Sequence, residues 1–360
     1  MRVASIVGAR PQFIKCILVS NELRKKHEEI LIHTGQHYDY EMSELFFDEL
    51  KIPKPDYNLG VGSASHGEQT GRMLIEVEKV LLKEKPDLVL VYGDTNTTLA
   101  GALASVKLHI PVGHVEAGLR SFNRSMPEEI NRILVDHISD ILFAPTKTAV
   151  NNLRKEGISR GIYLVGDVMY DILKKSISIA EKSRILEKLG LTPKEYFLAT
   201  VHRASNTDNV KNLSSILEAF SEIEEKIVFP IHPRTLNFIK KHNLEKKMKR
   251  NILAIKPVGY FDFICLEKNA KKIITDSGGV QKEAYILGVP CITLREETEW
   301  VETVDHGWNI LVGSNKERII DAVLHFKPKC GRKNLFGDGN ASKKIVKILD
   351  EYLSETKMIQ

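Results

Sequence analysis

Residues 87–116 read DLVLVYGDTNTTLAGALASVKLHIPVGHVE, and this stretch shows the unit from which the chain is built. An apolar run, Asp87–Tyr92, ends at a glycine and is followed by a segment of helical length, Asn96–Lys107, and a second apolar run, Pro111–Glu116. Runs that are apolar throughout are typical of strands buried on both faces of a parallel sheet. The stretch is therefore predicted to be a strand–helix–strand unit.

The same unit recurs along the 360 residues in two series, which predicts an α/β fold of two Rossmann-like, doubly wound domains. The first series of expected strands is Val3–Val7, Ile30–Thr34, Asp87–Tyr92, Pro111–Glu116, Ile141–Ala144 and Ile162–Val165, and the second is Tyr196–Val201, Lys226–Ile231, Ile252–Lys256, Lys271–Thr275, Pro290–Leu294 and Asn309–Val312. Leu173–Pro193 is expected to connect domains over residues 1–168 and 169–344. Ligands of such folds bind outside the carboxyl ends of the strands, so the cleft between the domains is the expected site.

The composition is that of a globular protein, with 42% hydrophobic and 28% charged residues and a net charge of +5. The sequence has no block of Lys and Arg interleaved with aromatic residues, so a nucleic-acid-binding groove is not indicated. The modest positive net charge suits an anionic small-molecule ligand. The four cysteines, Cys16, Cys265, Cys291 and Cys330, form no C-x-x-C pair, so neither a zinc site nor a disulfide framework is indicated. With no signal-peptide pattern and no apolar stretch of about 18 residues, the chain is expected to be soluble and cytoplasmic, without a membrane partner.

Two turns after predicted strands are candidates for binding a phosphate group. In the first, Gly8-Ala9-Arg10-Pro11, a helix is expected to begin with Arg10 at its mouth and Lys15 one turn inside, where free N–H groups and two cations would hold a diphosphate. A plain strand–helix turn with a solvated Arg and Lys is the alternative. The chain has no G-x-G-x-x-G and no G-x-x-x-x-G-K-[ST], so neither a dinucleotide fingerprint nor a P-loop is predicted.

The second turn is Thr275-Asp276-Ser277-Gly278-Gly279, in which two glycines would let the backbone approach a phosphate closely. Glu283, farther along the expected helix, is a candidate for binding both hydroxyls of a ribose. A helix cap by Asp276 or Ser277 is the alternative for this turn.

Acidic and basic side chains also follow predicted strands. Asp94 and Glu116 end neighbouring strands and are expected side by side at one edge of the sheet, and Glu128 lies at the start of a helix. Carboxylates that share a pocket push their pKa values apart, so that one serves as base and another as acid, although each is also compatible with a salt bridge or a cap. His202-Arg203 and His232-Pro233-Arg234 are candidates for a phosphate or leaving-group clamp.

Taken together, these residues resemble the non-hydrolysing UDP-N-acetylglucosamine 2-epimerase family from end to end. The resemblance is carried, in order, by Gly8-Ala9-Arg10-Pro11 with Lys15, Thr34-Gly35-Gln36-His37, Val91-Tyr92-Gly93-Asp94-Thr95, His114-Val115-Glu116-Ala117-Gly118-Leu119-Arg120, Pro127-Glu128-Glu129, His202-Arg203, Asp276-Ser277-Gly278-Gly279 with Gln281 and Glu283, and Leu294-Arg295 to Thr298-Glu299. It implies two Rossmann-like domains facing across a cleft, as in glycosyltransferase-B enzymes, with a C-terminal helix, about residues 345–360, that joins the first domain.

The resemblance also implies an activity and a set of site residues. The activity is reversible epimerisation of UDP-N-acetylglucosamine to UDP-N-acetylmannosamine by anti elimination of UDP to 2-acetamidoglucal and re-addition, without a cofactor or metal, as a supply for cell-surface polysaccharide or glycan. Asp94, Glu116 and Glu128 match the carboxylates that transfer protons, and His202 is also expected at the catalytic centre. The residues expected to bind substrate are Arg10, Lys15, His232, Ser277, Gly278, Gly279, Glu283 and Arg295.

A second molecule of UDP-N-acetylglucosamine often acts as an allosteric activator in this family, and a homodimer is expected. The residues that match the activator region are Gln36, His37, Gln69 and Arg72. Two segments depart from the family pattern and bear on loop shape and on activation. The common His-Arg-x-Glu-Asn has Ser205 in place of Glu, and the common Thr-Glu-Arg-Pro-Glu has Trp300 and Val301 in place of Arg and Pro. The alternatives are a hydrolysing epimerase that releases UDP and N-acetylmannosamine, a UDP-sugar glycosyltransferase, and a UDP-sugar-binding sensor.

Overall fold

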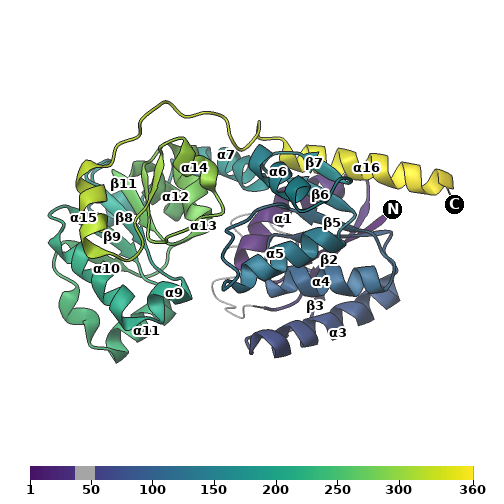
Figure 1. Ribbon diagram of the computed structural model, residues 1–360, viewed down its shortest axis with the longest axis horizontal. Helices are drawn as coiled ribbons and strands as arrows, with labels where there is room; N and C mark the ends of the chain where they lie inside the picture. The colour runs from purple at the N-terminus through teal and green to yellow at the C-terminus, as the bar shows by residue number, and fades with distance from the viewer. Residues whose placement is uncertain (37–52, 360) are drawn as a thin grey trace. The chain divides into compact units, whose positions relative to one another are not determined.

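The computed structural model describes residues 1–36 and 53–359, and the chain divides into two compact units. The first unit is Met1–Lys174 with Asn334–Gln360, and the second unit is Lys175–Lys333. Each unit is a parallel sheet with helices between successive strands (Figure 1), which confirms the predicted doubly wound α/β fold. The division falls after Lys174, within helix α7 (Val168–Ala180). The boundary predicted from the sequence, at residue 168, lies a few residues earlier.

The first unit holds a seven-stranded sheet in the order β3-β2-β1-β4-β5-β6-β7. The strands are β1 Arg2–Val7, β2 Glu28–His33, β3 Tyr57–Asn58, β4 Leu88–Tyr92, β5 Val112–Val115, β6 Ile141–Ala144 and β7 Ile162–Leu164. The helices are α1 Arg10–Leu23, α3 His66–Glu84, α4 Asn96–Lys107, α5 Pro127–Ile138, α6 Lys147–Lys155, α7 and α16 Ala341–Ile359. The strand order reverses between β1 and β4, and such a reversal leaves a crevice at the carboxyl ends of the two strands. Among the strands within the described residues, β3 alone was missed from the sequence, because a strand of two residues carries no recognisable pattern.

The second unit repeats this plan with a six-stranded sheet in the order β10-β9-β8-β11-β12-β13. The strands are β8 Tyr196–Thr200, β9 Lys226–Pro230, β10 Ile252–Ile255, β11 Lys272–Thr275, β12 Cys291–Thr293 and β13 Asn309–Leu311. The helices are α8 Ile185–Leu189, α9 Ala204–Thr207, α10 Val210–Glu222, α11 Pro233–Lys241, the 3-10 helix Leu244–Lys247, α12 Tyr260–Asn269, α13 Gly278–Leu287, α14 Val301–Asp305 and α15 Lys316–His325. Here the order reverses between β8 and β11.

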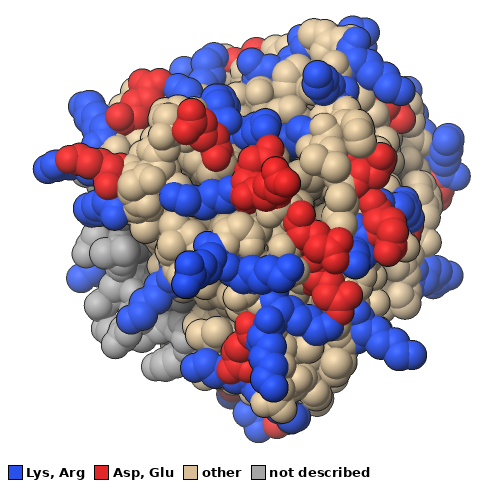
Figure 2. Space-filling view, turned by 90° about the vertical axis from the view of Figure 1, so that its left-hand side faces the viewer, with Lys and Arg blue, Asp and Glu red and all other residues tan. Residues whose placement is uncertain are grey.

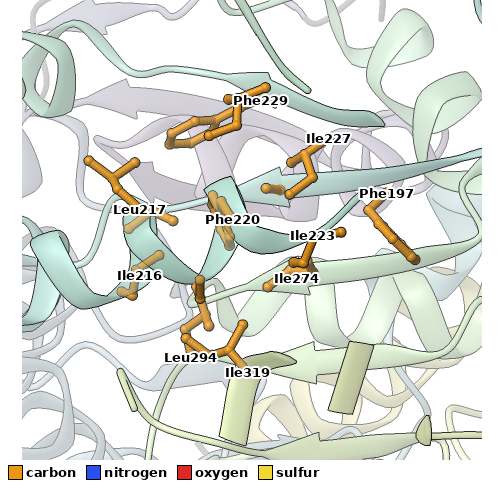
Figure 3. Close-up of a cluster of buried hydrophobic side chains, with 14 of the residues drawn as sticks. Phe197, Ile216, Leu217, Phe220, Ile223, Ile227, Phe229, Ile274, Leu294 and Ile319 are labelled. Atoms are coloured by element: carbon orange, nitrogen blue, oxygen red, sulfur yellow. The ribbon is translucent and has the colours of Figure 1, made fainter. Parts of the chain in front are cut away.

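The core of the second unit shows why its strands are apolar throughout (Figure 3). Phe220 of α10 meets Phe229 of β9 edge-on, with ring centroids 5.9 Å apart, and Ile227 lies in the same buried cluster. Val228, between the two β9 residues, belongs instead to a second cluster that includes Leu266 of α12. Successive residues of a strand point to opposite faces, so both faces of this sheet are covered by helices.

Mixed charges cover the side of the second unit that carries α10, α11 and α15, where Figure 2 shows Lys and Arg interspersed with Asp and Glu. Lys316 of α15 pairs with Glu222 of α10 at 2.7 Å, and Arg318 pairs with Glu296 at 3.2 Å. Exposed ion pairs contribute about 0–1 kcal/mol each to the free energy of unfolding. The stability of the unit therefore rests on its buried clusters.

Helix α16 returns the end of the chain to the first unit, where it packs against α1. Its start is held by the buried carboxylate of Asp171, which accepts hydrogen bonds from the N–H groups of Ala341 and Ser342 at 3.1 and 2.8 Å. Farther along, Asp350 lies 2.6 Å from Nε2 of His27. Of the helices in the described residues, none combines the length and the apolar character needed to cross a membrane.

We expect Asp171→Ala to loosen the start of α16. Loss of an N-terminal cap costs about 1–2 kcal/mol, which corresponds to roughly tenfold faster hydrogen exchange where local opening limits it. The measurement is hydrogen exchange by mass spectrometry on peptides covering residues 341–352. Glu78→Ala, which removes an exposed carboxylate of α3, is the control and should leave that exchange unchanged. Equal exchange in wild type and Asp171→Ala would contradict the role of this cap.

Candidate active site

The turn after β1 approaches its neighbours too closely for any side chain at Gly8. A Cβ atom there would lie 2.0 Å from Oγ1 of Thr34 and 2.2 Å from Oγ1 of Thr97. The N–H groups of Gly8 and Ala9 donate to Oε1 of Gln12 at 2.9 and 3.0 Å, and Nε2 of Gln12 donates to the carbonyl of Tyr92. These two N–H groups, which come just before the helix start that was predicted to bind a diphosphate, thus bond within the protein. A Gln three residues after an N-cap is the sequence signal that would have identified Gln12.

Glu116 and Lys15 form a buried ion pair at the end of β5. Nζ of Lys15 lies 2.5 Å from Oε1 of Glu116, and the two side chains are 12% and 6% exposed. Glu116 has a φ of +76°, a conformation that costs a non-glycine residue about 1–3 kcal/mol and collects at functional sites. The N–H groups of Glu116 and Ala117 both donate to the carbonyl of Phe143 on β6 at 3.1 Å, which holds the turn in place.

Asp94 follows β4, and its carboxylate is held by a buried guanidinium that the sequence did not single out. Oδ2 of Asp94 accepts from Nε and Nη2 of Arg132 at 3.0 and 2.6 Å. Nη1 of Arg132 donates to Oε2 of Glu129 at 2.7 Å, so one guanidinium joins two carboxylates. Arg132 is 2% exposed, whereas the side chain of Asp94 is 24% exposed and has a face open to a ligand.

The predicted carboxylates lie on neighbouring elements of the first unit. Tyr92 pairs with Val115 between β4 and β5, so Asp94 and Glu116 leave the same edge of the sheet. Glu128 is half-buried in the first turn of α5, four residues before Arg132, and therefore on the helix face that reaches Asp94.

In the second unit, the carboxylate of Asp276 fastens the turn after β8. It is fully buried and accepts from the N–H groups of His202 and Arg203 at 3.1 and 3.0 Å and from Nδ2 of Asn206 at 3.1 Å. Asp276, which follows β11, therefore forms hydrogen bonds to the turn that follows the neighbouring strand β8. The sequence indicated only a cap of its own helix as the structural role of Asp276. The side chain of His202 is 45% exposed at this edge.

Helix α13 begins beside a buried carboxylate. A Cβ on Gly278 would lie 2.1 Å from Oε1 of Glu299, whereas a Cβ on Gly279 would meet nothing nearer than Oγ of Ser277, 3.9 Å away. Glu299 pairs with Nη2 of Arg295 at 2.9 Å, and both side chains are about 5% exposed. Ser277 precedes the helix in an extended conformation, and its hydroxyl makes no capping hydrogen bond. The start of α13 is thus accessible at Ser277 and Gly279, and Arg295 contacts Glu299.

Glu283 and His232, both predicted to bind substrate, contact other groups of the second unit. Glu283 is 7% exposed and interacts with Glu267, which is fully buried. Burial, together with the charge and hydrogen bonding of Glu283, raises the pKa of Glu267 well above its ordinary value, so Glu267 is a neutral acid beside Glu283. His232 is exposed and caps α11, with Nδ1 accepting from the N–H of Arg234 at 3.2 Å.

The residues matched to an activator region divide into two groups. Gln36 and Gln69 are buried, and Nε2 of Gln69 donates to the carbonyl of Gln36 at 3.3 Å. Nδ2 of Asn96 donates to Oε1 of Gln69 at 2.9 Å, which ties both residues to the start of α4. Arg72 lies on the exposed face of α3 and pairs with Glu68. His37 lies outside the described residues, and within those residues no group of three or more His, Cys, Asp or Glu is arranged to hold a metal ion.

Comparison with known proteins identifies the family. Residues 21–350 match the family model for UDP-N-acetylglucosamine 2-epimerase. The chain belongs to this family. It is 62% identical to a UDP-N-acetylglucosamine 2-epimerase homolog of Methanococcus maripaludis, over 97% of this chain and 99% of the relative. It is 49% identical to the UDP-2,3-diacetamido-2,3-dideoxy-D-glucuronate 2-epimerase of Pseudomonas aeruginosa, with the same coverage.

Solved structures of the epimerase family have the same fold. The crystal structure of the Methanocaldococcus jannaschii UDP-GlcNAc 2-epimerase in complex with UDP-GlcNAc and UDP is 52% identical, covers 98% of this chain and 100% of its own, and superposes with a TM-score of 0.92.

Trp300, a departure from the common epimerase pattern, is part of the second unit's core. Its side chain is 3% exposed, and Nζ of Lys282 lies 4.0 Å from the centre of its ring, a cation–π contact. Its Nε1 would lie 3.6 Å from a Cβ on Gly278. The indole therefore packs beside the start of α13. Ser205, the other departure, is exposed on α9, and its carbonyl accepts from Nδ2 of Asn212 at 2.9 Å.

Substitution of the two glycines at the start of α13 is expected to have opposite effects. Gly278→Ala forces Glu299 from its pair with Arg295 and should lower the free energy of unfolding by about 1–3 kcal/mol. Gly279→Ala has room for its methyl group and gains helix propensity, so it should be neutral or stabilising by up to about 1 kcal/mol. Urea unfolding monitored by Trp fluorescence tests this, and equal effects of the two substitutions would contradict it.

A pH-dependent contribution to stability is expected from Glu129. Burial alone would raise the pKa of its carboxyl, but the N–H of Ser121 and the guanidinium of Arg132 outweigh burial and lower the pKa below the ordinary 4.5. A carboxyl with a lowered pKa stabilises the fold above its unfolded value and loses that contribution as the pH falls through the folded value. Glu129→Gln should therefore cost about 3 kcal/mol or more at pH 7, and less and less below about pH 4.5.

The measurement is the urea midpoint of wild type and Glu129→Gln at a series of pH values from 7 down to about 3.5. Glu78→Gln on the exposed face of α3 is the control and should match wild type throughout. A gap between wild type and Glu129→Gln that stays constant with pH would exclude this account.

Proposed function

We propose that this chain interconverts UDP-N-acetylglucosamine and UDP-N-acetylmannosamine without releasing free sugar. The observation that carries the proposal is the pair of carboxylates at the adjoining ends of β4 and β5, Asp94 and Glu116, each in contact with a cationic side chain. Binding alone does not require carboxylates beside a diphosphate, whereas proton transfer at carbon does.

The proposed reaction begins with removal of the C2 proton of the sugar by one carboxylate. The C1–O bond breaks and its electron pair goes to the β-phosphate oxygen, which gives UDP and 2-acetamidoglucal. In the return step, a UDP oxygen attacks C1 while a proton is delivered to C2 on the opposite face. Two faces need two proton-transfer groups, and Asp94, Glu116 and Glu128 are the proposed set.

The leaving diphosphate requires positive charge and hydrogen-bond donors, because C2–H is weakly acidic and departure of UDP must be made favourable. We assign this task in the second unit to His202 and to the open start of α13 at Ser277 and Gly279, where N–H groups of the first helical turn attract anions. Arg10 and Lys15 are the proposed contribution of the first unit.

A second sugar is also a candidate for the substrate. The Pseudomonas aeruginosa relative is named for a 2,3-diacetamido-2,3-dideoxy-D-glucuronate, which undergoes the same inversion at C2 with a different sugar ring. The proton chemistry proposed for Asp94 and Glu116 is the same for both sugars. We further propose a cytoplasmic homodimer, activated by a second molecule of UDP-N-acetylglucosamine, whose product supplies a cell-surface polysaccharide.

Proton NMR in deuterated water tests the proposal. Purified protein with UDP-N-acetylglucosamine should give the manno epimer with deuterium at C2 and UDP still attached. Glu116→Gln should slow conversion by about 10²–10⁴-fold, while Glu78→Gln should convert normally. Free N-acetylmannosamine with accumulating UDP would identify a hydrolysing enzyme instead. No conversion of this sugar, with conversion of the diacetamido uronate, would move the activity to the second candidate.

A further inference from the structure

His114 lies at the end of β5 between two hydrogen-bond acceptors. Its side chain is fully buried, and Nε2 lies 2.7 Å from the carbonyl oxygen of Gly93, while Nδ1 lies 2.7 Å from Oδ1 of Asp136 on α5. A carbonyl oxygen can only accept, so Nε2 carries a proton and donates it. The protonation of Nδ1 then depends on the state of Asp136.

Asp136 has the surroundings of an ionised carboxylate. Its other oxygen, Oδ2, accepts from Nη1 of Arg120 at 2.7 Å and from the N–H of Gly118 at 3.0 Å. Two donors, one of them a permanently charged guanidinium, thus stabilise the ionised form of Asp136 without any contribution from His114. An ionised carboxylate accepts at both oxygens, so Nδ1 of His114 donates as well.

When the partly exposed Glu156 is counted, the charges around Arg120 balance if the imidazole is a cation. Arg120 pairs with Asp136 and with Oε2 of Glu156, the latter at 2.6 Å. A protonated His114 gives two cations against two carboxylates, whereas a neutral ring leaves one negative charge in excess. Glu156 is 27% exposed, so this excess charge would be partly solvated, and the two hydrogen-bond acceptors that face the ring favour the imidazolium more than the charge balance does.

The cluster reaches the backbone of both turns that carry the candidate carboxylates. His114 bonds the carbonyl of Gly93, the residue before Asp94, and Asp136 bonds the N–H of Gly118, two residues after Glu116. Glu116 has a φ of +76°, so its turn needs such support to keep its conformation. One carboxylate on α5 thus fixes the ends of two neighbouring strands.

We propose that His114 is a buried imidazolium that, together with Asp136, positions the Asp94 and Glu116 turns for proton transfer. Both are positioning residues, since neither side chain reaches the exposed edge of the site. Their catalytic consequence rests on the proposed function, whereas the protonation state of His114 does not.

Nitrogen-15 NMR of protein labelled at its 12 histidines measures that protonation state directly. The His114 ring, assigned by its absence from His114→Gln, should show two similar nitrogen shifts and two ring N–H protons that exchange slowly with water at neutral pH. Two widely separated nitrogen shifts, the signature of a neutral ring, would overturn the proposal. If His114→Gln does not fold, the signal is assigned instead by its change in Asp136→Asn.

Asp136→Asn tests positioning, because it keeps the size of the side chain and removes its charge. The His114 ring should become neutral, with Nε2–H still bound to Gly93 and Nδ1 accepting from the new amide. We expect kcat to fall about 10–100-fold with KM little changed, as for other residues that orient catalytic groups. Unchanged kcat in a folded Asp136→Asn variant would overturn the positioning role.

Asp140→Asn is the matched control. Asp140 accepts from the N–H of Val112 at 2.9 Å at the other end of β5, so it supports the same strand away from the site, and its substitution should leave kcat and the His114 spectrum unchanged. A wild-type protein without epimerase activity would overturn the proposed function alone, since the His114 spectrum is read without substrate.

Discussion

The reversal of strand order in each sheet is the constraint on which the site depends. At β1/β4 and at β8/β11 the strand order opens a crevice at the carboxyl ends. Backbone groups in such a crevice lack sheet partners, and side chains from elsewhere satisfy them: Gln12 bonds the turn after β1, and Asp276 bonds the turn after β8. These inner polar residues serve the fold, and they leave Asp94 and His202 partly exposed at the two crevices.

The buried ion pairs of the first unit fix the orientations of the candidate carboxylates more than they add to the free energy of unfolding. A buried ion pair loses much of its attraction to desolvation, and an apolar replacement of similar volume is often as stable. The guanidinium of Arg132, by contrast, sets the orientation of Asp94 through two hydrogen bonds from one planar group. Lys15 does the same for Glu116 with a single ammonium. The carboxylates are therefore presented in defined orientations, which proton transfer to carbon requires.

The sequence predicted the elements and the neighbouring places of two of the candidate carboxylates, because both depend on local pattern. Apolar runs ending in Gly-Asp and Val-Glu were sufficient to place Asp94 and Glu116 at adjoining strand ends. What it missed are partners far along the chain: Arg132 is 38 residues from Asp94, and no spacing rule joins them. Glu283 shows the same limit, since the fully buried Glu267 beside it lies on a different helix.

The two ion pairs also give the carboxylates different surroundings. In the proposed reaction a proton leaves one face of C2 and another arrives at the opposite face, so one group must accept a proton while a different group donates one. Arg132 stays charged and holds Asp94 by two hydrogen bonds, and the side chain of Asp94 is 24% exposed. Lys15 contacts Glu116 with a single ammonium, and the side chain of Glu116 is only 6% exposed. One carboxylate is thus partly open to solvent and the other is almost covered, and two carboxylates in different surroundings suit a reaction that needs one to accept a proton and another to donate one.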